Sequence, residues 1–154
     1  MHGIALGLAI DLASSADIRI CAADTRFAVK EVDIGLAADI GTLARLPKVV
    51  GSMSWVKDVC MSARDFSPQE ALDVGFVSQV HPSKALAVEA GVKLAVALAG
   101  KSPIAVQGTK EVLNHARDHS VADSEFSLLS TRRLGLPSLR RRGWGCYDEV
   151  GWRC

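Results

Sequence analysis

Long hydrophobic runs, a surplus of charge and a dense set of cysteines are all missing from this sequence of 154 residues. No apolar run approaches the roughly 20 residues that a membrane-spanning helix needs, so we expect no membrane partner. The formal net charge is only +1, from 18 basic and 17 acidic side chains, so the chain as a whole is not a polyelectrolyte. The first residues contain no basic n-region, and we therefore expect no signal peptide.

The four cysteines argue against two kinds of small protein. Their spacing does not fit a zinc site, and they are sparse for a secreted scaffold held together by disulfides. Reduced thiols in an intracellular compartment are therefore the expectation. The cysteines are Cys21, Cys60, Cys146 and Cys154.

What the sequence contains is typical of a folded globular domain. Hydrophobic residues make up 49% and charged residues 23%, which argues against a disordered or low-complexity chain. The length allows one domain of about 150 residues with a sizeable core. Core-like apolar sequence already fills residues 3–10, and a free-standing domain rarely begins with its most buried element. We therefore expect part of the fold to lie upstream of the first residue.

The composition changes near residues 130–132. Residues 132–154 contain six arginines against two acidic side chains, whereas residues 1–131 carry a net negative charge. Neither helical nor strand periodicity runs through the arginine-rich segment. One interpretation is a basic arm for nucleic acid or acidic lipid. The interpretation we adopt is an atypical basic tail that is unstructured and binds no nucleic acid.

The periodicity predicts short strands early in the chain and helices after them, which is an α/β (α+β) fold. The clearest helix start is Ser67-Pro68-Gln69-Glu70, with a serine cap, a proline in the first turn and a glutamate three residues after the cap. Thr42 is expected to cap another helix. Helices are expected over residues 5–14, 42–50, 52–62, 67–75, 83–99, 102–117 and 120–132. Strands are expected over residues 18–21, 25–29 and 76–80, and a loop over residues 34–41.

Three carboxylates stand among apolar neighbours. Asp11 interrupts an otherwise apolar run, Asp39 lies among small apolar residues, and Glu31 is flanked by Val32. Burying an ionised carboxylate without partners is costly, so we expect each to be hydrogen-bonded or to take part in chemistry, such as acid–base catalysis. The structural alternatives are a hydrogen-bonded core residue for Asp11, a strand-edge charge for Glu31 and a helix cap for Asp39. Metal binding by the three is a further alternative, although no histidine lies near them in the sequence.

Two segments resemble a known family. Residues 2–12 and 16–19 resemble the oxyanion segment of the enoyl-CoA hydratase/isomerase (crotonase) superfamily, and residues 27–43 closely resemble its Δ3,5-Δ2,4-dienoyl-CoA isomerases. The resemblance implies a partial crotonase-like spiral fold, with short β-strands followed by a helical C-terminal region. Residues 1–131 would then be the C-terminal part of a crotonase-like domain. Further segments that fit the subfamily are residues 45–47, 71–77, 101–108 and 117–121.

The resemblance also implies roles for individual residues. Asp11 matches the first catalytic acid of the family, Glu31 the second, and Asp39 an extra acid of the isomerases. Glu31 and Asp39 would transfer the protons that move a pair of double bonds, and Asp11 would line the cleft. The Leu8 backbone N–H, next to Gly7, would bind the thioester oxygen in an oxyanion hole at a helix N-terminus. The family commonly has glycine where Leu8 stands, so the Leu8 side chain is expected to point away from the substrate.

The reaction implied by the resemblance is the isomerisation of 3,5-dienoyl-CoA to 2,4-dienoyl-CoA in fatty-acid β-oxidation. The fatty acyl-CoA substrate carries the coenzyme A, so no separate cofactor and no metal are expected. The complete family member is expected to form a homotrimer or hexamer in a peroxisome or mitochondrion, and this chain to be an incomplete enzyme. Two alternatives stay open: a 2-enoyl-CoA hydratase, and a truncated, non-catalytic protein that binds partner subunits or, through its arginine-rich tail, anionic surfaces.

Overall fold

The computed structural model describes residues 1–123. The chain divides into two compact units, Met1–Lys101 and a second unit that begins at Ser102. The predicted basic tail and residues 124–132 of the last predicted helix lie outside the described residues. The tail, that helix and the domain boundary at residue 131 therefore stay predictions.

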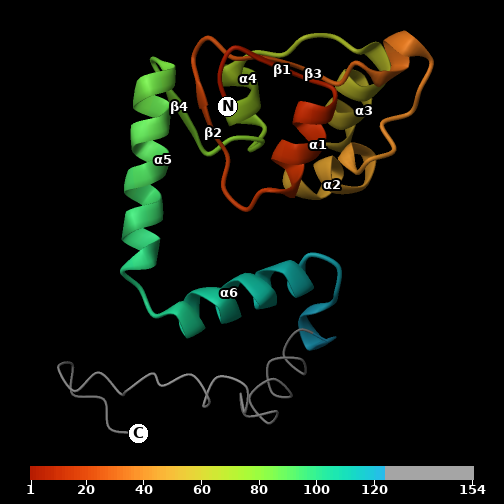
Figure 1. The fold of residues 1–154 in the computed structure, drawn as a ribbon. Helices are drawn as coiled ribbons and strands as arrows, with labels where there is room; N and C mark the ends of the chain where they lie inside the picture. Colours follow the sequence, from red (N-terminus) through yellow and green to blue (C-terminus); the bar gives the residue numbers. More distant parts are fainter. Residues whose placement is uncertain (124–154) are drawn as a thin grey trace, which may run out of the picture. The chain divides into compact units, whose positions relative to one another are not determined.

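Short parallel strands form the framework of the first unit (Figure 1). β1 (Ile4–Leu6) pairs with β3 (Arg26–Ala28), and β2 (Ile20–Ala22) pairs with β4 (Gln79–His81). Each strand is only three residues long, so the pairs depend on helices that cover them. These strands and helices confirm the predicted mixture of short β-strands and helices.

The helices of the first unit lie between and after these strands. They are α1 (Leu8–Ser15), the 3-10 helix η1 (Glu31–Ile34), α2 (Thr42–Val49), α3 (Met53–Ser62), α4 (Pro68–Asp73) and α5 (Lys84–Ala99). The second unit contains α6 (Pro103–Ala116). None of the helices in residues 1–123 has the length and apolar character that a bilayer crossing requires.

Serine caps explain where four of these helices begin. The side chain of each capping serine accepts a hydrogen bond from the backbone N–H three residues later, which satisfies a donor that the helix itself leaves unpaired. The predicted start at Ser67-Pro68 is therefore confirmed. The capping serines are Ser52, Ser67, Ser83 and Ser102.

Aromatic rings fill the core of the first unit. Phe27 of β3 stacks on Phe66 with ring centroids 5.2 Å apart, and Phe76 meets both rings edge-on. Trp55 of α3 adds a further edge-on contact to Phe66 at 5.0 Å. The three phenylalanines are buried, and each contributes about 1.5–3 kcal/mol through the apolar area it removes from water. This cluster joins β3 to the segment between α3 and α4.

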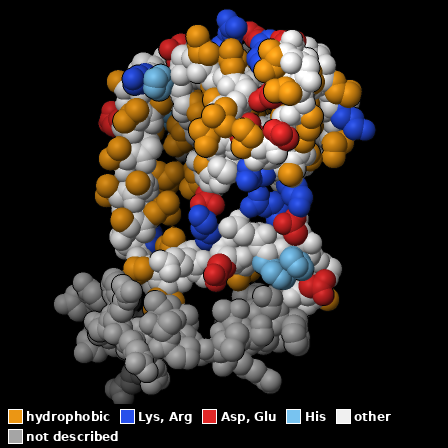
Figure 2. Space-filling model, turned by 45° about the vertical axis from the view of Figure 1, so that its right-hand side comes forward, with side chains coloured by type: hydrophobic (Ala, Val, Ile, Leu, Met, Phe, Trp, Pro, Cys, Tyr) orange, Lys and Arg blue, Asp and Glu red, His pale blue; other side chains and the backbone are white. Residues whose placement is uncertain are grey.

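α5 differs from the other helices because it is apolar on nearly all sides. It packs against β2 and β4, where Ala87 is buried. Figure 2 shows hydrophobic side chains gathered along its length. The exposed apolar side chains on α5 include Leu86, Val88, Val92, Val96 and Leu98.

The start of the chain corrects the first predicted helix. The pattern predicts one helix over residues 5–14, whereas the chain forms β1, turns at Gly7 and then forms α1. Gly7 has φ +54°, a left-handed conformation that glycine adopts without steric cost. A short apolar run fits a buried strand as well as a buried helix, so periodicity alone does not separate the two.

Other predicted boundaries move by a few residues. The strand expected at residues 18–21 is Ile20–Ala22, and the strand expected at residues 76–80 is Gln79–His81. The expected loop at residues 34–41 begins inside η1. Thr42 does not cap α2, because the N-cap is Gly41 and has no side-chain bond. Buried loop residues such as Phe76 give the same apolar signal as a strand, which explains the early start of the predicted strand.

Candidate active site

The turn between β1 and α1 leads into a helix N-terminus that has no side-chain cap among the described residues. The Gly7 N–H donates to the Ala28 carbonyl at 3.0 Å, which fixes the turn to β3. Leu8 is the first residue of α1, so its N–H has no acceptor within the helix. The Leu8 side chain is 53% exposed. The backbone N–H and the positive end of the α1 dipole are therefore suited to bind a negatively charged oxygen.

The Glu31 carboxylate lies against this turn. Glu31 begins η1, three residues after β3 ends. A Cβ atom placed on Gly7 would lie 3.2 Å from Glu31 Oε1, so only a glycine leaves the carboxylate its ordinary room. Glu31 Oε2 is buried and has no hydrogen-bond partner among the described residues. A buried carboxylate oxygen without a partner costs stability, and such groups are characteristic of sites where a base must stay reactive.

α3 closes another side of Glu31. Cys60 of α3 is 6% exposed. Burial raises the pKa of the Cys60 thiol above its usual value, and the Glu31 charge raises it further. The thiol is therefore protonated and inert at neutral pH, which makes it part of the wall rather than a nucleophile.

Asp11 is the most deeply buried of the three predicted carboxylates. It lies in the first turn of α1 and is 2% exposed. Its Oδ1 accepts a hydrogen bond from the Thr42 backbone N–H at 2.6 Å. This bond satisfies an otherwise unpaired donor at the start of α2, so Asp11 joins the beginnings of two helices. The structure thus gives Asp11 a hydrogen-bonded place in the core, and its role beside a substrate stays a prediction.

Asp39 is placed differently from the expectation of burial. It is exposed, in the irregular segment between η1 and α2. Its side chain makes no hydrogen bond or ion pair with the part of the chain that the structure describes, and it does not cap α2. Of its two neighbours, Ala38 is buried in the core whereas Ile40 is exposed, so the apolar residues around Asp39 do not enclose it. The predicted role of Asp39 in proton transfer is not tested by this position.

The three carboxylates do not form a metal site in the structure. Within residues 1–123, no group of three histidine, cysteine, aspartate or glutamate side chains lies close enough together to hold a metal ion. Asp11 faces the start of α2, whereas Glu31 faces Gly7 and α3. Asp11 is therefore hydrogen-bonded, whereas the buried Oε2 of Glu31 has no hydrogen-bond partner among the described residues.

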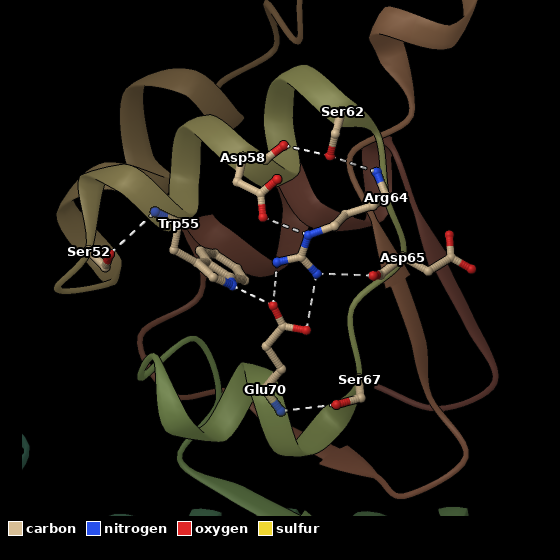
Figure 3. Close-up of polar contacts among 8 residues, drawn as sticks. All are labelled: Ser52, Trp55, Asp58, Ser62, Arg64, Asp65, Ser67 and Glu70. Atoms are coloured by element: carbon tan, nitrogen blue, oxygen red, sulfur yellow. Dashed lines mark hydrogen bonds and ion pairs between the residues drawn. The ribbon is translucent and has the colours of Figure 1, made fainter.

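A second polar cluster, which the sequence analysis missed, joins α3 to α4 (Figure 3). Arg64 Nη2 and Nη1 bind the Glu70 carboxylate at 2.6 and 3.2 Å, and Arg64 Nε binds Asp58 at 2.7 Å. Trp55 Nε1 donates to Glu70 Oε1 at 2.7 Å. The hydrogen bonds from Arg64 lower the pKa of Glu70. The sequence marks Glu70 only as a helix-start residue, and no local pattern indicates its partners.

The sequence pattern of the enoyl-CoA hydratase/isomerase family matches residues 1–130. The chain belongs to this family. The chain is 51% identical to the mitochondrial Δ3,5-Δ2,4-dienoyl-CoA isomerase of Homo sapiens, over 87% of this chain and 43% of the relative. It is 44% identical to the peroxisomal Δ3,5-Δ2,4-dienoyl-CoA isomerase of Arabidopsis thaliana, over 79% of this chain and 43% of the relative.

Solved structures of the family confirm the predicted crotonase-like fold. A probable enoyl-CoA hydratase/isomerase from Mycobacterium abscessus matches with a TM-score of 0.79 and 30% identity, over 86% of this chain and 51% of the other. A putative enoyl-CoA hydratase from Thermobifida fusca in complex with CoA matches with a TM-score of 0.80 and 27% identity, over 90% and 53%. The chain spans less than half the length of the curated dienoyl-CoA isomerases it matches.

Proposed function

We propose that this chain contributes the proton-transfer residues and one oxyanion donor to a Δ3,5-Δ2,4-dienoyl-CoA isomerase site. The observation that carries the proposal is the Glu31 carboxylate, which has one buried and unpaired oxygen beside the turn at the N-terminus of α1. The identity of about half the residues to dienoyl-CoA isomerases supports the same reaction. The name of the family supports the acyl-CoA class of substrate.

The proposed chemistry moves one proton off the substrate and one proton onto it. Removal of a proton from the dienoyl chain places negative charge on the thioester oxygen, and the Leu8 N–H donates a hydrogen bond to that oxygen. Glu31 and Asp39 share the removal of one proton and the delivery of the other, so atoms balance and only the double bonds move. Asp11 holds α1 to α2 and thereby keeps the Leu8 amide in place. The substrate carries its own coenzyme A, and the mechanism calls on no further cofactor.

The proposal extends to the rest of the pocket, the location and the assembly of the complete protein. This chain covers only 43% of the relative from Homo sapiens, so we expect the second oxyanion donor and the rest of the acyl-CoA pocket to come from sequence outside it. The names of the relatives support a mitochondrial or peroxisomal location. A homotrimer or hexamer stays a prediction for the complete protein.

The test is an isomerase assay on the protein in the length and assembly that it has in its source cells. The conjugated 2,4-dienoyl-CoA product is followed by its ultraviolet absorbance. We expect turnover of 3,5-dienoyl-CoA, and we expect Asp39→Asn to reduce it by about 100-fold or more because one of two proton transfers is lost. Full activity in Asp39→Asn would overturn its assignment. Hydration of crotonyl-CoA without dienoyl isomerisation would replace the proposal with a 2-enoyl-CoA hydratase.

A further inference from the structure

The segment between α3 and α4 runs beside the part of the chain that carries Glu31. We call residues 63–66 the α3–α4 connector. Phe66 and Phe27 form an antiparallel bridge, with the Phe66 N–H donating to Phe27 at 2.9 Å and the Phe27 N–H donating to Phe66 at 3.3 Å. Asp65 Oδ2 pairs with Arg26 Nε at 2.7 Å. The connector therefore lies antiparallel to the end of β3, with Phe66 beside Phe27.

Lys30 extends these contacts to the turn that begins with Glu31. Its Nζ donates to the Ala63 carbonyl at 2.5 Å and lies 3.4 Å from Asp65 Oδ1. It also lies 3.5 Å from Asp33 Oδ2, on η1 itself. Lys30 is the N-cap residue of η1, so its side chain ties the start of that short helix to the connector. Lys30 directly precedes Glu31 in the chain, but its ammonium forms ion pairs with Asp33 and Asp65.

Ala63, whose carbonyl accepts the hydrogen bond from Lys30 Nζ, has an unusual backbone conformation. Ala63 has φ +52°, and it is the one residue other than glycine with a positive φ in the described part of the chain. Its side chain is 1% exposed. The next residue, Arg64, is held by both Asp58 and Glu70, which leaves the connector little freedom to move (Figure 3). Strained backbone of this kind persists where surrounding contacts fix it, and it often supports a functional site.

The other side of the turn leaves Glu31 little room. Glu31 Oε1 lies close to Gly7, and Cys60 of α3 lies near enough for the Glu31 charge to affect its thiol. Around η1, the Asp33 N–H donates to the Lys30 carbonyl at 3.1 Å, and the Leu36 N–H, two residues beyond the end of η1, donates to the Glu31 carbonyl at 3.0 Å. A short 3-10 helix has few such bonds of its own, so its position depends on outside anchors such as the contacts of Lys30 with Ala63 and Asp65.

We infer that Lys30, bound to the Ala63 carbonyl of the α3–α4 connector, is a positioning residue that holds η1 so that the Glu31 carboxylate stays against the Gly7 turn. The claim that the position of Glu31 matters for turnover rests on the proposed function. The claim that Lys30 holds η1 in place does not. Displacement of a reacting group by about 1 Å lowers rates by up to about 100-fold, so the anchor matters for turnover more than for substrate binding. Lys30 acts through Glu31 and does not touch the substrate.

The test compares two variants that remove the same charge. Lys30→Met removes the bond to Ala63, whereas the control Arg26→Met removes a cation that shares the Asp65 partner but lies on β3. Amide hydrogen exchange at Asp33 and Leu36, measured by NMR, reports on η1. We expect exchange about tenfold faster in Lys30→Met than in the control, with the α5 amides unchanged in both. Lys30→Arg keeps a cation with several N–H donors, and we expect it to restore most of the protection.

The Cys60 thiol gives a second readout that a general loss of stability does not produce. Because the Glu31 charge raises the Cys60 pKa, a Glu31 that leaves its place lowers that pKa. We expect Lys30→Met to lower the Cys60 pKa toward the value measured in Glu31→Gln, and Arg26→Met to leave it unchanged. Equal exchange rates and equal Cys60 titrations in Lys30→Met and Arg26→Met would overturn the inference.

Isomerase kinetics separate this inference from the proposed function. In active protein, we expect Lys30→Met to lower kcat about tenfold with KM within about twofold of the wild-type value. A rise in KM with unchanged kcat would contradict a positioning role. If the wild-type protein has no isomerase activity, the proposed function fails, and the exchange and thiol measurements still decide whether Lys30 anchors Glu31.

Discussion

Glu31 and Glu70 are glutamates of the same compact unit in opposite surroundings. The Glu70 carboxylate accepts hydrogen bonds from Arg64 and Trp55, and its pKa is lowered by Arg64. One oxygen of Glu31 is buried without a partner among residues 1–123, and the other lies close to the Gly7 turn. The two side chains have the same chemistry, so the difference between them is made entirely by their neighbours.

The two glutamates therefore have different expected roles: Glu70 stabilises the fold, and Glu31 takes part in the proposed chemistry. Glu70 and its partners fasten α3 to α4, and the ionised form of Glu70 stabilises the fold. The buried Oε2 of Glu31 has no comparable hydrogen bond among residues 1–123, and an unpaired buried oxygen costs free energy that the rest of the unit must offset. The Lys30 anchor explains how a destabilising group is nevertheless held in one place.

The largest expected effect is that of Glu31→Gln on isomerase turnover. We expect kcat to fall about 10³-fold, because the carboxylate that we propose takes part in proton transfer is replaced by an amide of nearly the same shape. The free energy of unfolding should stay equal or rise, since the buried Oε2 that is replaced has no hydrogen-bond partner among the described residues to lose. Enzyme assay and urea denaturation of the same preparation measure both quantities.

Glu70→Gln is the matched control for that variant. It should keep turnover and lower the free energy of unfolding by about 1 kcal/mol, because Arg64 and Trp55 lose a charged acceptor that is partly exposed to solvent. If Glu31→Gln loses stability and Glu70→Gln loses turnover, the division between the two glutamates is wrong.

The second expected effect concerns the contact between Gly7 and Glu31. Gly7→Ala and Gly3→Ala both place a side chain at positive φ, +54° and +61°, and each should cost about 1–2 kcal/mol of stability. Only the alanine at position 7 meets the Glu31 carboxylate, because no atom in the described part of the chain lies within 4 Å of a Cβ at Gly3. Gly7→Ala should therefore lose turnover as well, while Gly3→Ala keeps it. Equal turnover in the two variants would show that Glu31 is not held against the turn.

A smaller effect is expected in the pH dependence of stability. The pKa of Glu70 is lowered in the folded protein, while an unfolded glutamate titrates near a pKa of about 4.3. The stabilisation by Glu70 is thus complete above the unfolded pKa and is lost as the pH falls through the lower, folded pKa. Urea denaturation should show a difference between wild type and Glu70→Gln at pH 7 that shrinks at about pH 3. A difference that grows on acidification would contradict the lowered pKa.

The smallest expected effect is that of Ala63→Gly. Glycine relieves the positive φ at this position, but it removes a buried methyl group and makes the unfolded chain more flexible. These contributions oppose one another, so the free energy of unfolding should change by less than about 1 kcal/mol. Thermal denaturation measures it, and a loss of several kcal/mol would mean that the Ala63 side chain, not its carbonyl, fixes the connector.

The sequence predicted local features better than distant contacts. Ser67-Pro68 could be placed at a helix start because capping depends on residues three apart in the chain. The bond between Lys30 and Ala63 joins residues 33 positions apart through a backbone carbonyl, and no side-chain pattern indicates it. The exposure of Asp39 could not be predicted either, since apolar neighbours in sequence do not have to close a core around a loop residue.

The most direct test of this account is a structure of the protein with 2,4-dienoyl-CoA, the proposed product, bound to it. We predict that the thioester oxygen accepts a hydrogen bond from the Leu8 N–H and that the Glu31 carboxylate lies beside the acyl chain. A thioester oxygen bound away from the start of α1, with Glu31 still facing only Gly7 and Cys60, would contradict the claim that Glu31 is the reacting carboxylate.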